Sequence, residues 1–193
     1  FLMLAGGRVF AADRYALIVT GASGGAQYAE KYDEWRNAFV QLLQGPLGYK
    51  EEHVLLLAEE EFAGARKATR ENVRAAISEI RQLAKKDDVV LVVLVGHGSG
   101  SDGGEAKFNL VGPDLNATDW AELVRPIPSR LVFINAASGS FPFIEQLSAP
   151  NRIVITANDS AAQTFETVMP PFLLAAYQDQ AARSEEHTSE LQS

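Results

Sequence analysis

The sequence predicts an α/β fold in which helices cover both faces of a mainly parallel central sheet, giving three layers. Short apolar segments alternate along the chain with segments in which apolar residues recur every three or four positions. Such alternation is typical of parallel sheets, because consecutive parallel strands need a helical crossover between them. Residues 88–98 (DVVLVVLVGHG) are too uniformly apolar for a strand with one wet face, which predicts the central strand.

Each predicted element begins or ends at a residue suited to that place. Residues 14–21 (RYALIVTG) form an apolar run that stops at a glycine, which predicts the first strand. Apolar side chains at spacings of four and three from Tyr28 to Leu42 predict a helix that ends near Gly45. Thr69 suits the N-cap of the next helix. The other expected elements are a strand at HVLLLAE, a helix from Val73 to Leu83, a hairpin-like excursion at AKFNLVGPDL, a helix at NATDWAELV, a strand at residues 131–135, a short helix from Pro142, a strand at RIVITAN and a helix around Phe165 to Tyr177.

The composition limits the chemistry of this chain of 193 residues. Its formal net charge of −8 disfavours nucleic acid as a partner, since such binding depends on Lys and Arg side chains that neutralise phosphates. The absence of cysteine excludes disulfides, zinc–thiolate sites and a thiol nucleophile. Three histidines leave little material for a metal site, and we expect neither a metal nor another cofactor. The oligomeric state does not follow from the sequence.

Both ends of the chain carry patterns that set them apart from the middle. Residues 1–12 are mostly apolar and close on VFA, the small-x-small pattern of a signal-peptide cleavage site. We interpret them as the remnant of a signal peptide and expect an exported protein, periplasmic or extracellular, with no membrane span in the mature chain. Residues 183–193 (RSEEHTSELQS) match the translation of a sequencing-library adapter. The prediction is one domain, residues 13–182, truncated at its C-terminal end.

A glycine-rich segment, residues 20–27 (TGASGGAQ), follows the first predicted strand. Gly21 and Gly24 match part of the spacing that lets a dinucleotide-binding loop approach a pyrophosphate, but the third position is Gln27. The acidic residue expected after the second strand has only Glu59 as its nearest equivalent. A nucleotide-binding oxidoreductase is therefore a minor alternative, and a plain loop is the main interpretation of this segment.

Two further strand ends carry residues suited to catalysis. His97 follows the predicted central strand in VGHGSG, where glycine neighbours leave the imidazole free to act as a general base. Residues 135–140 (NAASGS) form a polar, uncrowded segment after the strand LVFI. If the sheet is parallel, both segments emerge at the same edge, so a nucleophile and a base can meet there.

At these two strand ends the sequence resembles the legumain-like cysteine peptidases, which have the caspase–hemoglobinase fold. The family places its dyad histidine in a strand-end HG[ST] motif, matched here by LVGHGS with His97. Its cysteine lies two residues after a strand-terminal acidic or amide residue, and LVFINAAS places Asn135 and Ala137 in these positions. The resemblance extends from about Tyr15 to Phe172. It implies a caspase–hemoglobinase-like domain whose substrate pocket includes Asn135, Asn158 and Thr164.

The family's nucleophile is absent, because Ala137 has no reactive atom and the chain has no cysteine to replace it. Loss of a nucleophile costs on the order of 10⁶ in kcat. The resemblance therefore implies a peptidase homologue that is catalytically degenerate and binds a peptide or protein segment in the former substrate cleft. The alternative is an active hydrolase in which Ser138 attacks, His97 is the general base and backbone N–H groups near Gly98 stabilise the oxyanion.

Overall fold

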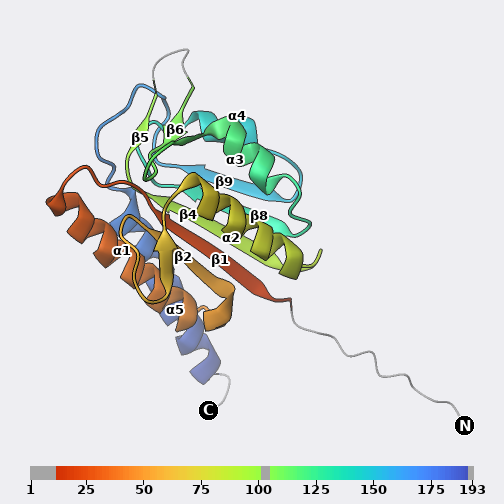
Figure 1. Ribbon diagram of the computed structural model, residues 1–193. Helices are drawn as coiled ribbons and strands as arrows, with labels where there is room; N and C mark the ends of the chain where they lie inside the picture. The colour runs from red at the N-terminus through yellow and green to blue at the C-terminus, as the bar shows by residue number, and fades with distance from the viewer. Residues whose placement is uncertain (1–11, 101–104, 191–193) are drawn as a thin grey trace, which may run out of the picture.

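A computed structural model of the chain describes residues 12–100 and 105–190 and contains a six-stranded parallel sheet (Figure 1). The spatial order is β3-β2-β1-β4-β8-β9, and every neighbouring pair is parallel. The strands are β1 (Arg14–Thr20), β2 (Val54–Ala58), β3 (Ala65–Lys67), β4 (Val89–Val95), β8 (Arg130–Asn135) and β9 (Arg152–Thr156). The predicted central strand is β4, whose last six residues are all buried.

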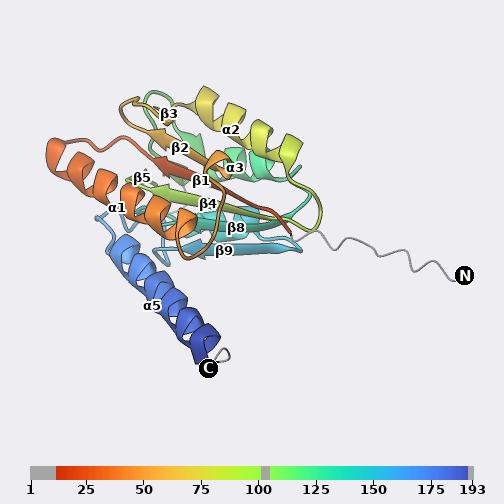
Figure 2. The same ribbon diagram turned by 90° about the horizontal axis from the view of Figure 1, so that it is seen from below.

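Helices cover both faces of the sheet, so the predicted three-layer α/β/α arrangement is confirmed (Figures 1 and 2). The first face carries α1 (Ala26–Gln44) and α5 (Met169–Glu190), and the second carries α2 (Arg70–Leu83), α3 (Ala117–Val124) and α4 (Pro142–Leu147). A short 3₁₀ turn, η1 (Glu51–His53), precedes β2. Side chains of β4 alternate between the two faces: Val92 packs under α2 and α3, and Val93 packs under α1.

The larger core, between the sheet and the helices of the second face, contains a row of aromatic rings in contact, one pair edge-on and one pair stacked. Phe133 on β8 lies between Trp120 of α3 and Phe143 of α4, with ring centroids 5.6 and 6.1 Å away. All three side chains are fully buried. Local signals place the helices that carry these rings: the Asn116 side chain accepts from the Asp119 amide at 2.7 Å in a capping box, and a proline opens α4.

The predicted N-cap at Thr69 and the predicted hairpin-like excursion at residues 106–115 are both confirmed. The Thr69 side chain accepts from the Asn72 amide at 3.3 Å and caps α2. The excursion forms a small antiparallel sheet of β5 (Gly98–Ser99), β6 (Lys107–Phe108) and β7 (Leu115–Asn116). The sequence prediction missed β3 and β5, which are too short to show an apolar pattern, and placed the start of α5 four residues too early.

The predictions for the chain ends stay predictions. The signal-peptide remnant falls almost wholly in residues 1–11, outside the described residues. The boundary expected after residue 182 lies within α5, and residues 191–193 are also outside the described part. Among the helices of residues 12–100 and 105–190, none combines the length and the apolar composition that a membrane crossing requires.

We expect Phe133→Ala to destabilise the protein by about 3–5 kcal/mol, because it opens a cavity between two other buried rings. Urea unfolding followed by circular dichroism measures this change. Phe172→Ala is the matched control, since its ring is 72% exposed and should matter by less than about 0.5 kcal/mol. Equal losses in the two variants would contradict the core described above.

Candidate functional site

The order of the strands marks the carboxyl edge between β1 and β4 as the place for a site. From β1 the chain continues to β2 and β3 on one side, and the later strands β4, β8 and β9 lie on the other side. In open α/β sheets, ligands bind outside the carboxyl ends of the strands at such a reversal. The segments that emerge there are the glycine-rich loop after β1, the His97 segment after β4 and the 136–140 segment after β8.

His97 lies at this edge and faces α1. The imidazole is half-buried, with the ring of Tyr28 edge-on at 4.7 Å between centroids and that of Tyr32 at 5.8 Å. The two tyrosines are one helical turn apart on α1, and both belong to the apolar face expected from the spacing of residues 28–42. In the sequence, two tyrosines four positions apart in the helix after the glycine-rich loop were the signal that could have predicted these contacts with His97.

A close contact joins the segment after β4 to the segment after β8. The Ser138 hydroxyl accepts from the Gly98 amide at 3.0 Å and donates to the Gly98 carbonyl, also at 3.0 Å. A Cβ atom at position 98 would lie 2.0 Å from the Ser138 carbonyl oxygen, so only glycine fits there. Ser138 is 2% exposed, and its hydroxyl proton points to a backbone carbonyl rather than to an imidazole.

The position that the family's cysteine would occupy lies in the core. Ala137 is fully buried and belongs to the cluster beneath α3 and α4, whereas the ring of His97 contacts α1 on the other side of the sheet. Asn135 is also buried, and its side-chain oxygen accepts from the Ala137 amide at 3.1 Å. Asn135 thus holds the turn after β8 in place, a structural role in addition to the one that the resemblance implies.

The segment after β9 closes over the same turn. The Asn158 side-chain oxygen accepts from the amide of Ser140 at 3.2 Å and from its hydroxyl at 3.0 Å. The Gly139 amide donates to the Gln163 carbonyl at 2.8 Å. Thr164 follows on an exposed stretch beside the turn. Among the described residues, Thr164 makes none of the hydrogen bonds that hold the turn. Ser140 belongs to the predicted 135–140 segment, but its role did not follow from the sequence: it is fully buried and links the two segments.

The glycine-rich loop is already occupied by contacts within the protein. Phe108 packs against it: a Cβ atom at Gly21 or Gly96 would lie 3.0 or 3.3 Å from its ring. The loop amides donate at 3.0 Å from Gly21 to Val95, at 3.1 Å from Ala22 to Asn109 and at 3.2 Å from Ser23 to Glu59. These contacts close the first part of the loop and use three of its amide donors, which disfavours a pyrophosphate bound there. Within the described residues, no three acidic or histidine side chains gather in a way that could hold a metal ion.

Comparison with known proteins supports the fold. No family model matches the sequence, and no curated protein matches it. Among solved structures, the chain is similar to the crystal structure of protein GSU0716 from Geobacter sulfurreducens, with a TM-score of 0.55 over 87% of this chain and 83% of that chain. The sequences are 15% identical, so this likeness shows the α/β fold alone.

We expect Gly98→Ala to destabilise the protein by about 1–3 kcal/mol, because the added methyl group collides with the backbone of the neighbouring segment. Thermal or urea unfolding measures the loss. Gly25→Ala is the control: a methyl group at position 25 would have no atom within 4 Å, and we expect a smaller loss. If both variants unfold alike, the close contact between residues 98 and 138 is absent.

Proposed function

We propose that this protein is a legumain-like peptidase homologue that has lost catalysis and binds a peptide or protein segment at the carboxyl edge of its sheet. The observation that carries the proposal is that His97 follows β4 and a buried alanine follows the adjacent parallel strand β8, at the same edge of the sheet. By the resemblance, His97 corresponds to the base of the family's dyad, and a methyl group stands at the position of the nucleophile. The proposal includes export, which depends only on the pattern in residues 1–12.

The hydrogen bonds of Ser138 favour binding over hydrolysis. A serine nucleophile needs its proton directed at a base, and here the proton goes to the Gly98 carbonyl. The Gly98 amide, which the alternative mechanism would use as an oxyanion donor, donates to the same hydroxyl. An active Ser138 would have to break both bonds and turn towards an imidazole that now contacts Tyr28.

The first test is incubation of the protein with a diverse peptide library, followed by mass spectrometry, alongside His97→Ala and Ser138→Ala. We expect no cleavage, but retention of a subset of peptides that weakens with His97→Ala. A fluorophosphonate probe should leave Ser138 unlabelled because the hydroxyl is buried. Cleavage that disappears in both variants would instead establish the serine hydrolase.

Ala137→Cys tests whether the frame of the peptidase survives. We expect this variant to show no peptide cleavage, because position 137 is fully buried and lies on the other side of the sheet from the His97 ring, and a buried thiol away from a base is inert. Ala136→Cys is a matched control, because the neighbouring alanine is equally buried but lies outside the family's position. Cleavage by Ala137→Cys alone that His97→Ala abolishes would contradict this separation and would show that the two positions can meet as a dyad.

A further inference from the structure

The segment between β9 and α5, residues 157–168, lies at the carboxyl edge of the sheet, where Figure 1 shows it as a blue loop. We call this segment the strap. It contacts three parts of the candidate site, namely the turn after β8, the segment after β4 and helix α1. Its contacts therefore decide how a partner can reach this edge.

Hydrogen bonds tie the strap to the turn after β8 at both of its ends. At the start of the strap, the Asn158 side chain accepts from the turn as described above. Further along, the Gln163 carbonyl accepts from the Gly139 amide at 2.8 Å. Close to α5, the Thr167 hydroxyl donates to the Ala136 carbonyl.

The strap also reaches the segment after β4 and helix α1. A Cβ atom at Gly100 would lie 3.2 Å from the Ala161 carbonyl oxygen, so the strap passes directly beside the segment that begins with His97. On the other side, the Lys31 ammonium on α1 donates to the Glu166 carboxylate at 2.7 Å. A segment that joins α1 to the turn after β8 lies across the end of β4, because β4 pairs with β8 and packs under α1.

The ion pair of the strap lies on the tyrosines that contact His97. The Lys31 Nζ atom is 5.6 Å from the centroid of the Tyr28 ring, and that ring is edge-on to the imidazole of His97. Burial first, and then the charge of Glu166, raise the pKa of the Tyr32 phenol, so this carboxylate acts on the second tyrosine as well. The strap is thus fastened next to the imidazole.

Polar contacts, and not burial, hold the strap in place. None of residues 157–168 is buried, and the two largest apolar side chains, Phe165 and Val168, are 85% and 69% exposed. The side chains of Lys31 and Glu166 are themselves 46% and 31% exposed, and exposed ion pairs contribute little to stability. The strap can therefore open at a low cost in free energy, because opening uncovers little apolar surface.

We propose that the strap is a lid over the end of β4, held closed by the Lys31–Glu166 ion pair and the Thr167 hydroxyl, and that it opens to admit the bound segment to His97. This inference rests on the proposed function, since it states what regulates access to the same edge. A site that is open for only a fraction of the time binds its partner more weakly by that fraction. Release of the strap should therefore raise the affinity of the site.

Hydrogen exchange of the Gly139 amide, followed by NMR, measures the opening, because this amide donates to a carbonyl of the strap. Glu166→Gln should speed its exchange about two- to fivefold, and Thr167→Val about three- to tenfold. The Gly98 amide donates to the turn itself and should exchange at an unchanged rate. Added salt should speed Gly139 exchange in the wild type but not in Glu166→Gln, because salt screens an exposed ion pair.

Diethyl pyrocarbonate, which modifies imidazoles, reports access to His97. Mass spectrometry can compare its modification with that of His53, which lies before β2 at the opposite edge of the sheet. The ratio of the two rates should rise in Glu166→Gln and Thr167→Val by factors similar to those of Gly139 exchange.

Glu79→Gln is the matched control for both measurements. It removes the same charge from another partly exposed ion pair, formed with Arg66 on β3, outside the strap. We expect it to change neither the exchange of the Gly139 amide nor the modification of His97. Unchanged rates in the two strap variants would overturn the inference, and so would equal changes in Glu79→Gln.

The peptide library separates this inference from the proposed function. We expect Glu166→Gln to retain more of the peptides that the wild type binds. Faster Gly139 exchange with unchanged retention would overturn the role of the strap in access, while the peptide-binding function stands. Faster modification of His97 with no peptide retained by any variant would support the lid and overturn the peptide-binding function.

Discussion

The close approach of Gly98 to Ser138 is the contact on which the candidate site depends. It brings the backbone after β4 within hydrogen-bonding range of the turn after β8, and it leaves no room for a side chain at position 98. The same contact takes both hydrogen-bonding functions of the Ser138 hydroxyl. One backbone approach therefore joins two strand ends and keeps the Ser138 hydroxyl hydrogen-bonded to the Gly98 backbone.

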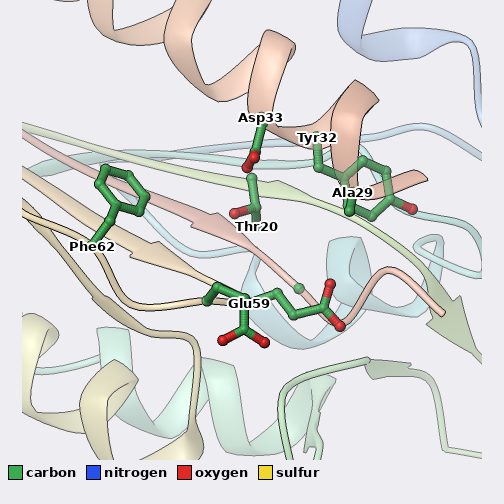
Figure 3. Close-up of a pocket in the computed structure, with 8 residues that line it drawn as sticks. Thr20, Ala29, Tyr32, Asp33, Glu59 and Phe62 are labelled. Atoms are coloured by element: carbon green, nitrogen blue, oxygen red, sulfur yellow. The ribbon is translucent and has the colours of Figure 1, made fainter. Parts of the chain in front are cut away.

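The imidazole of His97 is held by packing rather than by a catalytic partner. Its ring contacts two tyrosines of α1, while Ala137 packs in the core on the opposite face. The imidazole is thus a polar group held beside aromatic rings at the end of the sheet. Next to it, Thr20, Asp33 and Glu59 line a small hollow between the ends of β1 and β2 (Figure 3).

Sequence patterns predicted those elements whose stability is local or whose burial is uniform. The valine-rich run of β4, the apolar spacing of α1 and the Thr69 cap all follow from short-range rules. Strand β3 escaped prediction because its three residues pair with β2 through tertiary proximity and show no alternation. The role of Asn158 as the acceptor for the Ser140 amide was also beyond sequence, since the two residues follow different strands and meet only in the folded chain.

The sequence by itself determined that no thiol chemistry is possible, that a histidine ends the central strand and that a small-residue turn ends the next one. These conclusions depend only on inventory and on the period of apolar residues. The tertiary structure decided where the His97 ring faces, what the Ser138 hydroxyl bonds to and that Tyr32 lines a hollow with Glu59 and Glu60. Side-chain direction at a strand end depends on the neighbouring segments that pack there, and those segments come from distant parts of the chain.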